Sequence, residues 1–246
     1  SPDGREVAFT LGTRLVRAPV TGGTPTTVCE SGNARGTWLE RNTVVYTDRH
    51  RLVECSMSGQ STTLLAGDSA ETFTHAHSLP GDRAVLFGIQ RGAVTELAAF
   101  DLRTSRQKVL GIKGSNPRYV ATGHLVYVDL DRRVRAVPFD LSSLAASGES
   151  IGIDEEIGVE FGAAIMALSR TGTIVAPSTS STERALELVD RSGRAERLLP
   201  RVGEFSDPRF SPDGRRVVLT VGSDIWLFDR LQGALTRLSF DSSATR

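Results

Sequence analysis

Short runs of apolar residues alternate with polar turns along the chain, and no stretch has the apolar period of an amphipathic helix. The clearest example is near the C-terminus, where "RRVVLTVG", "SDIWLFDR" and "GALTRLSF" follow one another with short polar breaks. An earlier stretch divides in the same way into "FTHAHS", "RAVLFGIQ", "TELAAFDL" and "RQKVLGI". Strands of this length, at spacings of roughly 8–12 residues, predict an all-β protein.

One turn sequence occurs twice. Ser-Pro-Asp-Gly stands at Ser1–Gly4 and at Ser211–Gly214, each time before an apolar strand. Proline presets φ in such a turn, and glycine tolerates the positive φ of the residue that closes it. Four weaker copies lie between the two, each with an apolar residue, a four-residue turn and a strand. The six turns close at Gly4, Asn42, Gly81, Gly123, Gly172 and Gly214, which are 38 to 49 residues apart.

A repeat of about 42 residues with four strands is typical of a β-propeller blade. We therefore expect a six-bladed β-propeller of four-stranded antiparallel blades, with residues 1–246 forming one domain. The expected blades are 1–33, 34–70, 71–113, 114–155, 156–202 and 203–246. We expect the first blade to lack its innermost strand and the chain to be part of a longer one. The stretch "DLSSLAASGESIGIDEE" predicts an insertion between the outer strands of the fourth blade.

Charge and cysteine content narrow the range of partners. The chain has 29 basic and 29 acidic residues, a balance that argues against a nucleic-acid or anionic-membrane binder. No apolar run approaches the roughly 20 residues that span a bilayer. Cys29 and Cys55 have neither the spacing of a metal site nor the density of a disulfide scaffold, and we expect them to be buried free thiols.

Arg118 and Arg209 are the first candidates for ligand contact. Each comes directly before an aromatic residue, in "PRY" and "PRF", on the expected innermost strand of its blade. Arginines on such strands can line the central channel and bind an anionic ligand or a peptide carboxylate. They can equally pair with an aspartate of a neighbouring blade, which is the interpretation we favour from the sequence.

His75 and His77 lie two residues apart on an expected innermost strand, so alternation places both on one face. With Glu71 or Asp82 they could hold a metal ion. Alignment of the repeats, however, puts His77 in a slot before the turn and predicts that it packs between blades. His75 remains a candidate for channel-side ligand contact, together with Arg118 and Arg209. The slot residues are Trp38, His77, Tyr119, Leu168 and Phe210.

Ser150 lies in a Gly-Glu-Ser-Ile-Gly stretch, Gly148–Gly152, that has the spacing of a serine-hydrolase nucleophile. Such a nucleophile needs a buried strand before it and a helix after it, and the flanking residues predict neither. We interpret the stretch as a plain loop. The sequence therefore predicts no catalytic residue, no cofactor and no metal site.

Residues 208–241, "PRFSPDGRRVVLTVGSDIWLFDRLQGALTRLSFD", resemble the WD-like repeat of TolB-type propellers, and "SPDGREVAF" at the start of the chain has the same motif. Residues 123–141 and 186–200, "GHLVYVDLDRRVRAVPFDL" and "LELVDRSGRAERLLP", look like the C-terminal propeller of many bacterial serine/threonine protein kinases. This resemblance implies a non-catalytic sensing or interaction module on the extracytoplasmic side. Its partner would be a protein or small-molecule ligand at the propeller mouth.

Two alternatives stay open. The first is the substrate-filtering propeller of a prolyl-oligopeptidase-like serine peptidase, to which the chain is also similar. The second is a periplasmic TolB-like adaptor. The chain itself has no Gly-rich loop, His-Arg-Asp loop or Asp-Phe-Gly motif of a kinase.

Overall fold

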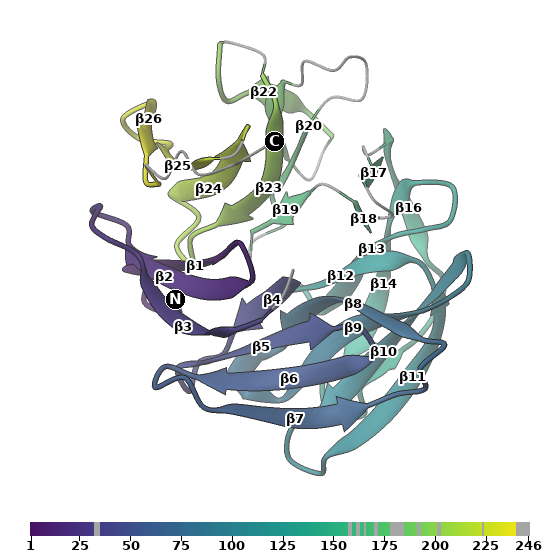
Figure 1. The fold of residues 1–246 in the computed structure, drawn as a ribbon. Coiled ribbons are helices and arrows are strands. Elements are labelled where there is room, and N and C mark those ends of the chain that lie inside the picture. Colours follow the sequence, from purple (N-terminus) through teal and green to yellow (C-terminus); the bar gives the residue numbers. More distant parts are fainter. Residues whose placement is uncertain are drawn as a thin grey trace.

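The computed structural model describes residues 1–31, 35–156, 159–160, 163–164, 166–169, 172–177, 185–190, 193–200, 203–222 and 224–239. The chain forms a six-bladed β-propeller with antiparallel blades arranged around a centre, and the first blade lies beside the last (Figure 1). The expected all-β fold is confirmed, including a first blade of three strands. In the described part of the chain, no helix is long and apolar enough to span a membrane.

The strands follow the chain blade by blade, and in the second to sixth blades the innermost strand comes first. The first blade has β1 (Glu6–Leu11), β2 (Arg14–Pro19) and β3 (Thr26–Glu30). The second has β4 (Arg35–Trp38), β5 (Thr43–Asp48), β6 (Arg51–Ser56) and β7 (Ser61–Ala66). The third has β8 (Thr72–Ser78), the short 3-10 turn η1 (Pro80–Asp82), β9 (Ala84–Arg91), β10 (Val94–Asp101) and β11 (Arg106–Lys113).

The second half of the ring is built in the same way. The fourth blade has β12 (Ser115–Val120), β13 (His124–Val128), β14 (Arg133–Asp140), β15 (Ala145–Ala146) and β16 (Ile151–Glu156), and both β15 and β16 pair with β14. A two-stranded sheet of β17 (Val159–Glu160) and β18 (Ala163–Ala164) follows. The fifth blade has β19 (Ala167–Leu168), β20 (Ile174–Pro177), β21 (Leu186–Val189) and β22 (Ala195–Arg197). The sixth has β23 (Phe205–Phe210), β24 (Arg216–Val221), β25 (Asp224–Asp229) and β26 (Ala234–Arg237).

The two Ser-Pro-Asp-Gly turns have the same hydrogen bonds. In the first copy the Ser1 hydroxyl donates to Asp3 at 2.6 Å, the Glu6 amide donates to the Ser1 hydroxyl at 2.9 Å, and the Gly4 amide donates to the Ser1 carbonyl at 3.0 Å. The second copy, Ser211–Gly214, repeats these bonds at 2.6, 2.9 and 2.9 Å. The closing glycines have φ of 70° and 68°, which is the backbone conformation that the sequence predicted for them.

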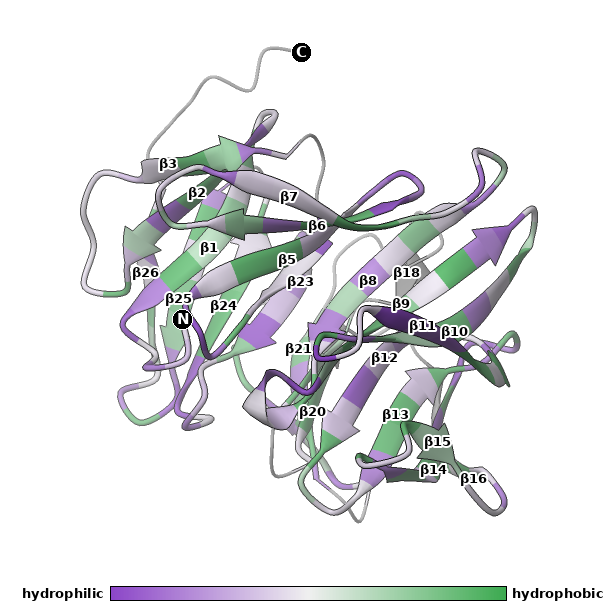
Figure 2. Ribbon diagram, turned by 90° about the horizontal axis from the view of Figure 1, so that it is seen from below, coloured by the Kyte–Doolittle hydropathy of each residue, from purple (hydrophilic) through white to green (hydrophobic). Residues whose placement is uncertain are grey.

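The core lies between the blades, where alternate side chains of neighbouring sheets face each other. Between the second and third blades, Val45 and Leu52 pack with Phe73 and Phe87, whose ring centroids are 4.9 Å apart. The strands β5 and β9 are buried along most of their length, and hydrophobic stretches lie within the strands of the blades (Figure 2). Because the apolar faces are buried only by neighbouring blades, each blade depends on the next for its stability.

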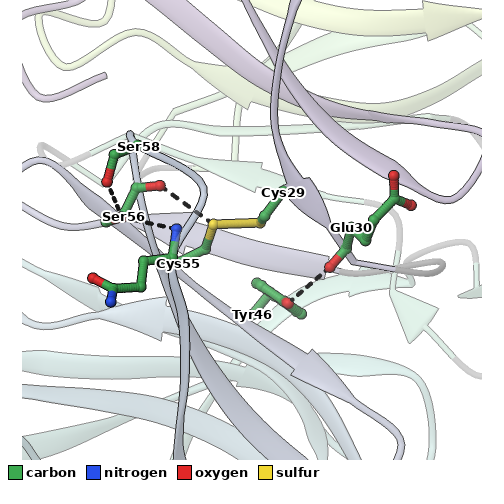
Figure 3. The surroundings of a disulfide bond; sticks show 7 residues. Cys29, Glu30, Tyr46, Cys55, Ser56 and Ser58 are labelled. Atoms are coloured by element: carbon green, nitrogen blue, oxygen red, sulfur yellow. Dashed lines mark hydrogen bonds between the residues drawn. A yellow bond between two sulfur atoms is a disulfide. The ribbon is translucent and has the colours of Figure 1, made fainter.

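Cys29 and Cys55 form a disulfide, so the expectation of free thiols was wrong (Figure 3). Cys29 belongs to the outer strand β3 of the first blade and Cys55 to β6 of the second, with Cα atoms 6.6 Å apart. Nearby, the Tyr46 hydroxyl donates a hydrogen bond to the Glu30 carbonyl at 3.2 Å. The cysteine spacing of 26 residues gave no signal because packing between blades, rather than a local motif, brings the two strands together.

Asp101 stabilises the end of β10. Its carboxylate accepts hydrogen bonds from the Arg103 and Thr104 amides at 2.9 and 3.2 Å and forms an ion pair with Arg83 at 2.6 Å. The Arg83 side chain, followed by the backbone amides, holds the pKa of Asp101 well below its usual range. A depressed folded-state pKa stabilises the protein above the unfolded-state pKa, near 4, and this contribution is lost as the pH falls further.

We therefore expect Asp101→Asn to lower the free energy of unfolding by about 2 kcal/mol at pH 7. The difference from the wild type should shrink as the pH falls below about 4, because the Asp101 carboxyl of the unfolded wild-type chain then takes up a proton while that of the folded chain stays ionised. Urea unfolding of the wild type and of Asp101→Asn, between pH 7 and pH 2.5, measures this difference in the free energy of unfolding. The control is Asp131→Asn, which removes the same charge from an exposed side chain. A difference between Asp101→Asn and the wild type that does not vary with pH would contradict the assignment.

Candidate functional site

The innermost strands surround a central cavity of about 940 Å³. The second to sixth blades each place one residue of the innermost strand, at the same position in the blade, in the wall of this cavity. We call this set of residues the channel ring. The channel ring consists of Thr37, His77, Arg118, Ala167 and Arg209.

Backbone hydrogen bonds define the equivalence between these positions. In the sixth blade the Ser211 amide donates to the Arg216 carbonyl at 2.9 Å, and in the third the Leu79 amide donates to the Ala84 carbonyl at 2.8 Å. In each case the ring residue lies two positions before the residue whose amide donates this bond. His77 therefore corresponds to Arg209, and Ser78 occupies the slot before the turn.

This placement corrects the expectation that His77 is a packing residue between blades. The sequence alignment was shifted by one residue in the third blade because it took Gly81 as the end of the turn. Asp82, with φ of 48°, is the residue that corresponds to Gly214. The pattern of a polar residue, a small or proline residue and a basic residue would have given the correct alignment. It is present in 75–77, 116–118 and 207–209.

Three innermost strands contain a β-bulge two residues before the ring position. His75, Asn116 and Asp207 lie there in the left-handed region, with φ of 55°, 53° and 48°. A bulge breaks the alternation of side chains along a strand. His75 and His77 therefore do not share a face as the sequence predicted: His75 is 6% exposed and lies outside the residues that line the cavity, whereas His77 lines it.

His75 is buried beside the cationic wall. Neither of its ring nitrogens has a hydrogen-bond partner among the described residues. Burial, and then the charges of Arg118, Arg35 and Arg209, lower the pKa of His75 to about 3. Burial and the charges of Arg118 and Arg209 also bring the pKa of His77 well below its usual value. Both imidazoles are therefore neutral at pH 7.

The acidic residues considered as metal ligands with these histidines have other partners. Glu71 accepts hydrogen bonds from Arg91, and the Asp82 carboxylate accepts the Glu40 and Arg41 amides of the second blade at 2.8 and 2.9 Å. Within the described ranges, no three His, Cys, Asp or Glu side chains are grouped to hold a metal ion.

Arg118 is the most unusual residue of the channel ring. Its side chain lines the cavity and is only 6% exposed, yet no described carboxylate forms an ion pair with it. Burial, and then the charge of Arg209, bring its pKa well below the usual value for arginine. The pairing with an aspartate of a neighbouring blade, which we favoured from the sequence, does not occur for Arg118 within the described chain.

Arg209 and Arg35 extend the positive wall of the cavity. Asp207 lies 3.9 Å from Arg35, and its charge raises the pKa of Arg209. Burial outweighs that effect, so the pKa of Arg209 is still lowered. A single aspartate therefore lies beside two arginines, and Arg118 has no carboxylate of its own in the described part of the cavity wall.

Ser150 lies in the loop between β15 and β16, so the element that follows it is a strand and not the helix that a serine nucleophile needs. Its hydroxyl accepts a hydrogen bond from the Tyr127 hydroxyl at 3.0 Å. A serine nucleophile instead donates its proton to a base such as histidine.

Taken together, the cavity wall can bind an anion. The guanidinium groups of Arg118 and Arg209 can donate several hydrogen bonds to a carboxylate, and burial strengthens such contacts. The sequence identified both arginines as channel-side residues. It did not show that Arg118 has no carboxylate partner among the described residues, because that depends on which strands meet around the centre.

No family model matches the chain, and no curated protein matches it. TolB from Acinetobacter baumannii aligns with a TM-score of 0.75 and 17% identity, over 98% of this chain and 65% of TolB. The tricorn protease aligns with a TM-score of 0.59 and 13% identity, over 97% of this chain and 30% of that one. A gluconolactonase from Xanthomonas campestris aligns with a TM-score of 0.65 and 13% identity, over 91% and 82% of the two chains.

The chain thus spans less than two thirds of the length of TolB and less than one third of that of the tricorn protease. At these identities the likeness shows the propeller fold alone.

Proposed function

We propose that the chain is a non-catalytic binding propeller whose central cavity takes an anionic ligand. The observation that carries the proposal is Arg118, a buried arginine in the cavity wall without a described acidic partner. A buried cation is costly unless it is paired and hydrogen-bonded. A carboxylate in the cavity would supply that partner, and Arg209 would add a second guanidinium group.

Citrate is a suitable probe because it has several carboxylates and fits a cavity of this volume. We expect citrate to raise the thermal unfolding midpoint of the chain and to give saturable heat in isothermal titration calorimetry. Arg118→Met should weaken this binding at least tenfold, because the variant keeps the side-chain length and loses the charge.

The matched control is Arg103→Met, which removes one positive charge from an exposed side chain. It should bind citrate as the wild type does. Equal citrate affinity in the wild type and in Arg118→Met would overturn the proposal.

We further propose that this propeller is the sensing part of a bacterial receptor-like serine/threonine kinase, on the extracytoplasmic side of the membrane. The resemblance of residues 123–141, 186–200 and 208–241 to kinase-attached propellers supports the attachment. The Cys29–Cys55 disulfide supports the location, since disulfides persist in oxidising compartments. The gene sequence on either side of this chain tests the attachment to a kinase. We expect a kinase domain and a membrane span upstream, whereas a downstream α/β-hydrolase domain would favour the peptidase alternative.

The non-catalytic character can be tested on the purified chain. We expect no turnover of esterase or peptidase substrates above that of buffer, because a strand, β16, and not the helix of a nucleophile turn follows Ser150. Ser150→Ala should leave all assays unchanged. Hydrolysis that this variant abolishes would show that the chain is an enzyme.

A further inference from the structure

We propose that the anionic ligand is a 2-hydroxy dicarboxylic acid, with one carboxylate on Arg118, the adjacent hydroxyl on His77 and the second carboxylate on Arg209. This inference rests on the proposed function and names the class of its ligand. Three features of the described chain carry it: the free acceptor atom of His77, the place of His77 next to Arg118, and the position of the two arginines in the channel ring.

His77 is the member of the channel ring that can accept a hydrogen bond from a ligand. The two arginines of the ring only donate hydrogen bonds, and its alanine has no polar side-chain atom. The Thr37 hydroxyl is already engaged, since it accepts a hydrogen bond from the Ser78 amide at 3.2 Å and lies 3.0 Å from the Ser78 hydroxyl. No hydrogen bond joins the His77 imidazole to another described residue.

The protonation state of His77 decides which group it accepts from. Burial, and then the charges of Arg118 and Arg209, keep the pKa of His77 well below its usual value, so the imidazole is neutral at pH 7. A neutral imidazole has one N–H donor and one acceptor nitrogen. An ammonium group at this acceptor would lie beside two buried guanidinium groups, which would repel it. A hydroxyl is uncharged and can donate, and it therefore fits this place.

His77 and Arg118 occupy adjacent positions of the channel ring. They belong to β8 and β12, the innermost strands of the third and fourth blades, which pack against each other. Both side chains line the cavity. A hydroxyl that donates to His77 therefore belongs close to a carboxylate that is bound by Arg118. We place the hydroxyl on the carbon next to that carboxylate, which is the arrangement of a 2-hydroxy acid.

Arg209 indicates the second carboxylate. Ala167, which has the smallest side chain of the channel ring, separates Arg209 from Arg118 around the ring. Asp207 compensates Arg209 only in part, because it also lies 3.9 Å from Arg35 and burial still lowers the pKa of Arg209. A ligand with one carboxylate at each ring arginine would supply both counter-charges, whereas a monocarboxylate would leave one guanidinium group without a ligand carboxylate.

The contacts of the hydroxyl and of the first carboxylate lie away from the first blade. His77 and Arg118 come from the third and fourth blades, and the fourth blade stands opposite the first in a ring of six. The recognition of a 2-hydroxy acid therefore does not depend on what lies beside β1.

Three four-carbon dicarboxylic acids that differ only at the second carbon test the hydroxyl. Malate has a hydroxyl there, succinate a hydrogen and aspartate an ammonium group. Isothermal titration calorimetry of the wild type at pH 7 should show that the tighter-binding enantiomer of malate binds about tenfold more tightly than succinate, because succinate leaves the His77 acceptor unpaired. Both enantiomers of aspartate should bind more weakly than succinate.

Two results with the wild type would overturn the assignment of the hydroxyl. The first is a malate affinity no higher than that of succinate, which includes the absence of malate binding. The second is an aspartate affinity equal to that of malate, because a charged donor would then serve as well as a neutral one.

Variants of His77 test which residue recognises the hydroxyl. His77→Leu should lower the malate affinity to that of succinate and leave the succinate affinity unchanged, whereas His77→Gln keeps a donor and an acceptor and should restore part of the preference. The matched control is His50→Leu, at a half-buried histidine between β5 and β6 that is outside the cavity lining; it should keep the full preference. Near-ultraviolet circular dichroism checks the fold of all three. A tenfold preference for malate in His77→Leu would overturn the role of His77.

The second carboxylate is tested with lactate, a 2-hydroxy acid that has only one carboxylate. Arg209→Met should weaken malate binding at least tenfold and leave lactate binding unchanged, because lactate has no group for Arg209. Equal losses for the two ligands would overturn the assignment of the second carboxylate to Arg209.

Citrate separates this inference from the proposed function. If citrate binding depends on Arg118 but malate binds no better than succinate, the 2-hydroxy assignment is wrong and the anion site stands. If citrate binding does not depend on Arg118, the proposed function is wrong as well.

Discussion

Replacing both cysteines of the Cys29–Cys55 disulfide with alanine is expected to lower the free energy of unfolding by about 3.5 kcal/mol, which follows from the loop entropy of a closure over 26 residues. The bond connects the first blade to the second. The first blade has three strands and therefore the least sheet of its own to hold it in the ring. Urea unfolding of the wild type and of the double variant Cys29→Ala/Cys55→Ala measures the difference.

The single variants distinguish a disulfide from two buried thiols. With a disulfide, Cys29→Ala, Cys55→Ala and the double variant lose similar stability, because each breaks the same bond. With free thiols the two losses would add, and each would be only the cost of a small apolar side chain. Additive losses would contradict the bond between the blades.

Replacing Arg118 with methionine is expected to stabilise the protein rather than destabilise it. Methionine has similar length and no charge, so Arg118→Met should raise the free energy of unfolding by about 2 kcal/mol in the absence of ligand, as replacement of buried charges by apolar side chains does in other proteins. Binding sites often reduce stability in this way, since a group held for a ligand is costly until the ligand arrives. Thermal and urea unfolding in buffer without carboxylates measures the change.

Two further variants show whether the gain comes from the buried charge. Arg209→Met should raise stability less, because Asp207 partly compensates Arg209. Arg103→Met, at an exposed position, should change stability little. A different result would contradict the proposal. If Arg118→Met loses as much free energy of unfolding as the loss of a buried ion pair costs, Arg118 has an acidic partner in the folded chain and the cavity is not an open anion site.

Local backbone chemistry could be predicted from the sequence because it depends on neighbouring residues. The turn residues Gly4, Asn42, Gly123 and Gly214 all have positive φ, as their glycine or asparagine identity indicated. From the spacing of these turns and the alternation of apolar residues, the sequence predicted an all-β propeller of six blades with three strands in the first. A blade is a contiguous stretch of chain, so its pattern can be read along the chain.

The relations between blades were decided by the tertiary structure. The sequence placed Cys29 and Cys55 in strands but could not pair them, because their contact crosses from β3 to β6. It assigned His75 and His77 to one face, whereas a bulge at His75 rotates the strand between them.

The same limit applies to the candidate site. The sequence identified Arg118 and Arg209 as residues of the channel, since each precedes an aromatic residue on an innermost strand. Whether a buried arginine has a counter-charge depends on the strands that face it across the centre. Those strands come from blades that are far apart in the chain, and only the arrangement of the blades around the centre brings Arg118 to the wall of a cavity in which no described carboxylate pairs with it.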